Sequence, residues 1–188
     1  MRHSLRTLVL TTVVLSLTGC GYNKLQELDE GVNKAQAQIQ TQLQRRADLI
    51  PNLVETVKGV AAQETSVFTA VAEARSRLAG AVQSGNLSEM AEANAAMTAP
   101  LGRLLAIAEA YPVLKSGTNF TQLQDQLEGT ENRVAVARTD YNAAVEQFNA
   151  TIRRFPTNLT AKMFGLSKSR EYYEATAVNA EQAPAVKF

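Results

Sequence analysis

The stretch that decides the fold runs from Leu123 to Phe155 and reads LQDQLEGTENRVAVARTDYNAAVEQFNATIRRF. Its large apolar residues recur every three, four or seven positions, at Leu123, Leu127, Val134, Tyr141, Val145, Phe148, Ile152 and Phe155. This spacing places them on one face of an α-helix. Pro156 ends the pattern, because proline cannot continue a helix. We therefore predict an amphipathic helix over residues 119–155 that buries its apolar face against other helices.

Three further helices are expected upstream, over residues 22–47, 48–84 and 86–111. These segments are rich in Ala, Gln, Glu and Leu, which favour helix, and they contain no Asn-Gly or Asp-Gly hairpin turn. Short helical segments are also expected after Pro156, in TNLTAKMFG and in SREYYEA. The prediction is an all-α protein, an elongated up-and-down four-helix bundle over residues 20–176, followed by a flexible tail over 177–188.

Two helix boundaries have clear signals. Gly85 should end the second helix, because glycine adopts the left-handed conformation at little cost. Asn86 should cap the third helix, in a reciprocal arrangement with Glu89. Pro100 should kink or restart that helix.

The join between the first two helices is less clearly marked. The apolar rhythm passes unbroken through residues 44–50, which would suit one long helix kinked at Pro51. Asp48, however, is a good N-cap, and Pro51 would then fall in the first turn, where its missing N–H does no harm. We favour a break with reversal at Asp48.

The N-terminus has the organisation of a secretory signal over residues 1–19. A basic head is followed by an apolar run, Leu8 to Leu17, that is too short to span a membrane permanently. The run leads into LTGC, and Cys20 is the only cysteine in the chain. This pattern resembles the lipobox of bacterial lipoproteins, which implies cleavage between Gly19 and Cys20 and fatty acylation of the thiol. The alternatives are an ordinary secreted protein and an uncut signal anchor.

The residue inventory argues against most catalytic chemistry. The only histidine, His3, lies in the signal, so the remainder lacks the residues of Ser-His-Asp or Cys-His catalysis and of His/Cys metal sites. Glu128 and Glu131, three residues apart and beside Asp125, could form a glycosidase carboxylate pair, but we expect these acids on a solvated helix face. We therefore predict no enzyme activity, no cofactor and no metal.

Charge gives no sign of a nucleic-acid partner. The chain has 19 basic and 18 acidic residues, and removal of Arg2 and Arg6 with the signal leaves one more acid than base. That balance gives no reason to expect nucleic acid or an anionic membrane surface as a partner.

Arg45, Arg46 and Asp48 form a candidate partner-binding cluster. In the simpler interpretation the two arginines close the first helix and Asp48 caps the second. In the other, they form a docking surface at the end of the bundle. We favour the simpler interpretation.

Aromatic residues are expected mainly in the core. This applies to the Tyr22-Asn23 and Tyr141-Asn142 pairs, and also to Phe148, Phe155, Phe164 and Tyr172, over which the C-terminal segments should fold. Lys115 lies in an expected loop, where it could contact a partner.

Four stretches together resemble the LemA family of bacterial envelope proteins. They are YNKLQELDEGVNKA from Tyr22, LQRRADLIPNLVETVKG from Leu43, EAYPVLKSGTNFTQLQDQLEGTENRVAVARTDYNAAVEQFN from Glu109 and FPTNLTAKMFG from Phe155. The resemblance implies a helical bundle exposed outside the cytoplasm. Many members carry an uncut N-terminal membrane helix, from which this chain departs at LTGC. The family has no agreed biochemical activity.

These observations together predict a non-enzymatic, lipid-anchored envelope protein that acts as a scaffold or adaptor. Gly21 follows the cysteine in place of the aspartate that retains lipoproteins at the inner membrane. In a two-membrane bacterium we therefore expect the periplasmic face of the outer membrane. A peptidoglycan-binding or cell-wall-remodelling protein and a self-associating membrane-organising protein are the alternatives.

Overall fold

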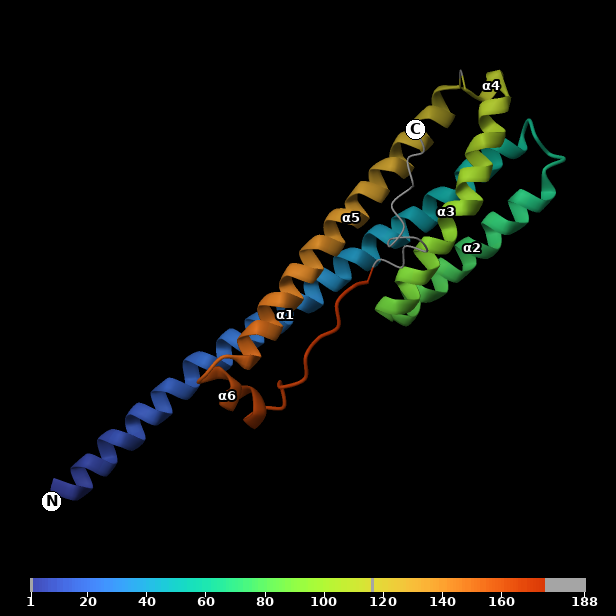
Figure 1. The fold of residues 1–188 in the computed structure, drawn as a ribbon. Helices are drawn as coiled ribbons and strands as arrows, with labels where there is room; N and C mark the ends of the chain where they lie inside the picture. Colours follow the sequence, from blue (N-terminus) through green and yellow to red (C-terminus); the bar gives the residue numbers. More distant parts are fainter. Residues whose placement is uncertain (1, 116, 175–188) are drawn as a thin grey trace, which may run out of the picture. The chain divides into compact units, whose positions relative to one another are not determined.

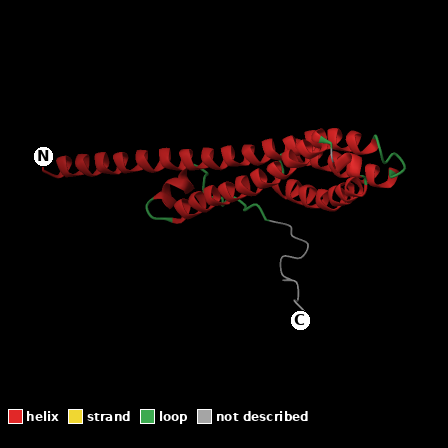
Figure 2. Cartoon of the chain, turned by 90° about the horizontal axis from the view of Figure 1, so that it is seen from above, coloured by secondary structure: helices red, strands yellow, loops and turns green. Residues whose placement is uncertain are grey.

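The computed structural model describes the backbone of residues 2–115 and 117–174, and the side chains of 21–114 and 117–174. The described chain is helical, without strands (Figures 1 and 2). Its helices are α1 (Arg2–Lys58), α2 (Thr65–Ser84), α3 (Leu87–Ala110), α4 (Pro112–Lys115), α5 (Thr118–Arg153) and α6 (Thr157–Met163). The prediction of an all-α helical bundle is confirmed. The expected tail over 177–188 lies outside the described residues.

The described residues form two compact units. Unit 1 consists of residues up to 37 together with 139–172, and unit 2 consists of residues 38–138 together with the described residues 173–174. Both α1 and α5 contribute one part to each unit. Each unit has its own buried apolar side chains, so each can be described separately.

Unit 2 is an up-and-down arrangement of the C-terminal part of α1, then α2, α3 and the N-terminal part of α5 (Figure 1). Its core includes fully buried leucine, isoleucine and methionine side chains from all of the first three helices: Ile39, Leu43, Ile50, Leu53, Leu78, Met90, Met97 and Leu104. The apolar face of α5 adds Leu127 and Val134. On this part of α5 the sequence periodicity therefore located both core-facing positions correctly.

The link between α2 and α3 follows the prediction closely. Gly85 is left-handed, with φ 71°, and its N–H donates to the Val82 carbonyl. Asn86 Oδ1 accepts from the backbone N–H groups of Ser88 at 2.9 Å and Glu89 at 3.3 Å. Glu89 does not return the bond to Asn86, however, because its carboxylate accepts from Ser84 Oγ at 2.7 Å. Helix α3 then continues through Pro100 without restarting.

The predicted break at Asp48 is wrong, and the alternative of one helix through Pro51 is correct. Asp48 lies inside α1, where its carboxylate accepts from Gln44 Nε2 one turn earlier, at 2.8 Å. The chain reverses later, between Lys58 and Thr65, where Gly59 begins a tight turn. A helix start needs orphan amides to cap, and an uninterrupted helix offers none at Asp48.

The reason that α1 tolerates Pro51 lies on another helix. Proline has no N–H, so the carbonyl of Ala47, four residues earlier, loses its partner within the helix. Arg75 of α2 supplies the replacement, because its Nε donates to the Ala47 oxygen at 3.0 Å. The contact comes from a residue 28 positions away, which the local sequence around Pro51 cannot reveal.

Replacing Arg75 with methionine should lower the free energy of unfolding by about 1–2 kcal/mol, because a half-buried carbonyl loses a charged donor. Urea denaturation followed by circular dichroism measures this. Arg77→Met, at an exposed position of the same helix, is the matched control and should have little effect. The double variant Pro51→Ala/Arg75→Met should recover part of the loss, since alanine restores the internal N–H. A loss unaffected by residue 51 would contradict the explanation.

Unit 1 combines α1 up to residue 37, α5 from residue 139, α6 and the segment that follows it. Its core contains Leu25, Val32, Tyr141, Val145, Phe148, Ile152 and Ala161. Helix α6 ends at Met163, and Gly165, two residues later, is left-handed with φ 74°. The second expected C-terminal helix is absent, since residues 166–174 contain no regular structure.

The aromatic prediction was only partly correct. Tyr141 and Phe148 are buried as expected, but Phe155, Phe164 and Tyr172 are all exposed. The buried tyrosine of the C-terminal segment is Tyr173, which belongs to unit 2. Phe155 lies beyond the end of α5 at Arg153, so the helical pattern no longer sets the direction of its side chain.

Candidate functional site

The predicted processing site lies within α1. The backbone at Gly19 and Cys20 is helical, and their side chains lie outside the described part of the chain. The next residue, Gly21, approaches α6 closely, since a Cβ placed on it would lie 3.4 Å from Thr160 Oγ1. One residue further, the Tyr22 and Phe164 rings meet with their centroids 4.4 Å apart. The helix that emerges from the predicted acylation site is therefore packed against α6 from its first described side chain.

The candidate partner-binding residues lie on different sides of α1. Arg45 and Asp48 are exposed and line a shallow hollow with Leu49 and with Val82 of α2. Arg46 is only 5% exposed. The structure thus brings Arg45 and Asp48 together and separates Arg46 from them. The interpretation that the arginines close a helix is wrong, because α1 continues for another three turns to Lys58.

Arg46 instead connects three helices inside unit 2. Its Nη1 donates to the side-chain oxygen of buried Asn94 on α3 at 2.6 Å and forms an ion pair with Glu131 on α5. Burial lowers the pKa of the Arg46 guanidinium, and the negative charge of Glu131 opposes this shift. The ordinary pKa of arginine is so high that the group remains charged. Arg46 is therefore engaged within the bundle and does not face a partner.

The carboxylates considered for glycoside hydrolysis lie on a solvated surface. Asp125, Glu128 and Glu131 are exposed on α5, and Glu131 is committed to Arg46. Within the described residues, no group of three His, Cys, Asp or Glu side chains is arranged to hold a metal ion. Of Lys115 only the backbone is described, at the end of α4.

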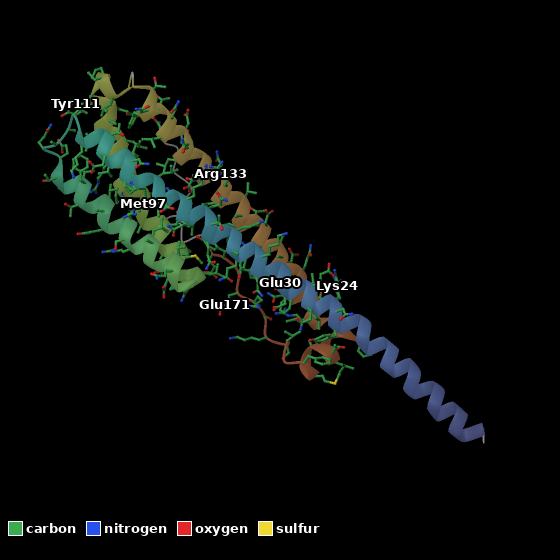
Figure 3. The ribbon with its side chains drawn as sticks, turned by 180° about the vertical axis from the view of Figure 1, so that it is seen from behind. Lys24, Glu30, Met97, Tyr111, Arg133 and Glu171 are labelled. Atoms are coloured by element: carbon green, nitrogen blue, oxygen red, sulfur yellow. The ribbon has the colours of Figure 1, made fainter. Side chains whose placement is uncertain are left out.

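Residues 166–172 of unit 1, defined here as the C-terminal strap, return to α5. The sequence indicated that the C-terminal segments fold back, but not the hydrogen bonds that hold them. The side chain of Asn149 on α5 makes two hydrogen bonds to the strap: its Nδ2 donates to the Arg170 carbonyl at 2.9 Å, and its Oδ1 accepts from the Arg170 N–H at 2.8 Å. Tyr141 donates from its hydroxyl to the Glu171 carbonyl at 2.9 Å. Glu171 is labelled on this strap in Figure 3.

The Arg170 side chain adds an ionic contact to the strap. Its Nη2 and Nε donate to Asp29 Oδ1 of α1 at 2.6 and 3.1 Å. Burial raises the pKa of the Tyr141 hydroxyl, which keeps it in the neutral form that donates this bond to the strap. Buried Asn149 and Tyr141 on one helix face were the available signal, because buried polar groups require partners.

In unit 2, the ring of Tyr173 lies against the guanidinium of Arg138, whose Cζ is 4.9 Å from the ring centroid. Burial raises the pKa of the Tyr173 hydroxyl. A neutral tyrosine ring beside a guanidinium is a stabilising cation–π arrangement. This contact orders the chain immediately after the strap.

A search of the described helices for a membrane-spanning segment found none with sufficient length and apolarity.

Comparison with known proteins adds a family and three relatives. The model of the LemA family matches residues 35–188. Magnetosome proteins MamQ 2 and MamQ 1 of Paramagnetospirillum magneticum are each 26% identical to this chain over 179 residues, covering 83% of this chain and 66% of each relative. Magnetosome protein MamQ of Magnetospirillum gryphiswaldense is 25% identical over the same coverage. The chain thus spans just under two thirds of the length of these relatives, and none of the names describes a catalysed reaction.

Proposed function

The chain belongs to the LemA family, and from that premise we propose that it is a non-enzymatic cell-envelope lipoprotein, anchored by acyl chains on Cys20 and acting as a scaffold or adaptor for other proteins. The observation that carries the proposal is LTGC at residues 17–20, directly after a basic head and a short apolar run. Two or three acyl chains anchor a protein stably, whereas one chain binds only marginally. In a two-membrane host, the anchored domain would face the periplasm from the outer membrane.

Two further observations support a non-catalytic role. Beyond residue 20 the sequence contains neither histidine nor cysteine, which removes the commonest nucleophile–base pairs. The similarity to proteins named for the magnetosome, with no reaction in their names, agrees with a structural role. The exposed hollow lined by Arg45 and Asp48 is the surface we propose for partner contact. Arg46, the third residue of the candidate cluster, is left out because it is buried.

Cys20→Ala should abolish incorporation of an alkyne-tagged fatty acid and leave the protein either soluble or as uncut precursor. The lone thiol is the only group on which a lipoprotein diacylglyceryl chain could be placed. In-gel detection of the tag, mass spectrometry of the N-terminal peptide and membrane fractionation measure the effect. Gly19→Ala is the matched control, because alanine keeps a small residue before the cysteine, and it should label normally. Unchanged labelling of Cys20→Ala would refute the anchor.

The adaptor role is tested in cells by photocrosslinking from position 45. A discrete crosslinked species containing a second protein is expected, with no equivalent product from exposed position 77 of α2, which lies outside the hollow. A ladder of homo-oligomers would instead favour the self-associating alternative. Co-sedimentation with purified sacculi would favour the peptidoglycan-binding alternative.

A further inference from the structure

The surface of unit 1 around α6 is unusually apolar. Four of the eight exposed large apolar side chains found in the described chain lie within ten residues of one another: Phe155, Leu159, Met163 and Phe164. Their exposed fractions are 80%, 57%, 64% and 50%, respectively. We call these four residues the α6 patch. Scattered exposed apolar residues are ordinary, but a local concentration of them indicates a contact surface.

Helix α6 is oriented opposite to the usual pattern of a surface helix. Its buried residues are Thr160 and Ala161, which are small, while its larger apolar residues Leu159 and Met163 face outward. Leu159 and Met163 are four positions apart and therefore share a face. A surface helix normally turns its largest apolar side chains toward the core. The outward face of α6 is thus suited to an apolar environment outside the protein.

The patch is surrounded by positive charge. Residues 153–170 contain five basic side chains and no acidic one. Arg153, Arg154, Lys162 and Lys168 are exposed, and only Arg170 is committed to an acidic partner, Asp29. Outward apolar residues with a rim of arginine and lysine are the combination that binds at the headgroup level of an anionic bilayer. A protein partner would need both an apolar groove for the patch residues and an acidic surface for the basic rim. An anionic bilayer supplies both, because its acyl chains can contact the apolar residues and its phosphates the basic ones.

The position of the patch along the chain also indicates that it contacts a bilayer. Gly21 packs against Thr160 of α6, and Tyr22 contacts Phe164 of the patch itself. Cys20 is one peptide unit away from Gly21, about 3.8 Å between Cα atoms. Lys24, labelled in Figure 3, is also exposed on α1, where its Nζ pairs with Glu27 at 2.9 Å. A chain held to a membrane at residue 20 therefore carries the patch within a few residues of the bilayer surface.

We propose that the α6 patch is an interfacial membrane-contact surface, which inserts Phe155, Leu159 and Met163 among the headgroups of an anionic bilayer and fixes the orientation of unit 1 on it. The proposal rests on the membrane anchor proposed above. It assigns the patch a different task from the acyl chains: the lipid holds the protein at the membrane, and the patch determines which side of unit 1 faces it.

The absence of tryptophan from the chain provides a clean test. The mature, acylated full-length protein is reconstituted into vesicles of phosphatidylcholine and phosphatidylglycerol containing brominated acyl chains. A single tryptophan is introduced as Leu159→Trp or Phe155→Trp, and Gln147→Trp, at an exposed position of α5 in the same unit, is the control. Bromolipid should quench the patch tryptophans at least threefold more than the control. Equal quenching at all positions would overturn the proposal.

A second pair of variants examines the chemistry of the patch. Adding Met163→Glu to Leu159→Trp should abolish most of the quenching, because a carboxylate on the same face opposes both apolar insertion and anionic lipid. Replacing phosphatidylglycerol with phosphatidylcholine should weaken quenching, since the basic rim then lacks its counterpart. Quenching that survives Met163→Glu, or crosslinking from position 159 that yields only a second copy or another protein, would assign the patch to a different occupant.

Failure of the anchor and failure of the patch are distinguishable. Intact mass of each sample reports acylation of Cys20 independently of fluorescence. An acylated protein with unquenched tryptophan would refute the patch and leave the anchor intact. A protein without acyl mass that is still quenched at positions 155 and 159 would refute the lipid anchor and support the contact surface.

Discussion

Replacing Arg46 with alanine should lower the free energy of unfolding by about 3–5 kcal/mol, because it removes one partner from a buried, charge-assisted network. The side-chain oxygen of Asn94, a residue only 7% exposed, would lose the Arg46 donor. Helices α1, α3 and α5 would also lose a side chain that connects all three. A cavity the size of the guanidinium would add to the cost. Urea denaturation of the mature full-length chain, followed by circular dichroism, measures the change.

The neighbouring arginine provides the control for this prediction. Arg45→Ala removes the same side chain one position earlier, where it is exposed, and should change stability by less than about 0.5 kcal/mol. Arg46→Met should fall between the two variants, since methionine fills much of the space and Glu131, with a half-exposed side chain, can turn toward solvent. Equal losses for Arg45→Ala and Arg46→Ala would show that the buried network contributes nothing specific.

The contrast between Arg45 and Arg46 shows where prediction from sequence ends. Two adjacent arginines look equivalent in a sequence, and only the helical phase relative to the core separates them. That phase follows from Leu43 and Ala47, both buried on α1, and it places Arg46 beside them. The assumed helix boundary at Asp48 hid this, because it assigned the arginines to a helix end. The partners Asn94 and Glu131 are 48 and 85 residues away and could not be chosen from local pattern.

Local signals predicted the fold well wherever a local interaction decides the structure. Gly85 and Asn86 end one helix and begin the next through bonds within four residues, so their roles could be read directly. Pro51 is the opposite case. Whether proline breaks a helix depends on whether the carbonyl it abandons finds another donor, and here that donor is Arg75 on a different helix. The favoured assignment failed because the deciding interaction was tertiary.

The overall composition concealed a segment whose charged residues are all basic. A chain with 19 basic and 18 acidic residues gave no reason to expect an anionic membrane surface as a partner. The average hides the segment 153–170, where every charged residue is basic. Phe155 was assigned to the core by periodicity and Phe164 as an aromatic residue, and the structure exposes both. Charge counted along the chain by segment would have identified this region.

The second large effect is expected at the C-terminal strap. Asn149→Ala should cost about 2 kcal/mol, because it removes both hydrogen bonds that fix the Arg170 peptide and leaves those backbone groups without their partners. The loss should be local: the strap should open while the core of unit 1, which includes Val145, Phe148 and Ile152, stays packed. Tyr141→Phe removes a single bond to the strap and should cost about half as much.

Hydrogen exchange measured by mass spectrometry separates local opening from global unfolding. In Asn149→Ala, peptides covering residues 166–172 should exchange roughly 30-fold faster, which is the equivalent of about 2 kcal/mol. Peptides from α5 around Val145 should change much less. Gln147→Ala, an exposed position two residues earlier on the same helix, is the control and should leave both regions unaffected. If the strap exchanges equally fast in the parent protein and in Asn149→Ala, then Asn149 does not hold it. If α5 and the strap accelerate together, the strap is part of the cooperative core of unit 1, and its hydrogen bonds stabilise the whole unit.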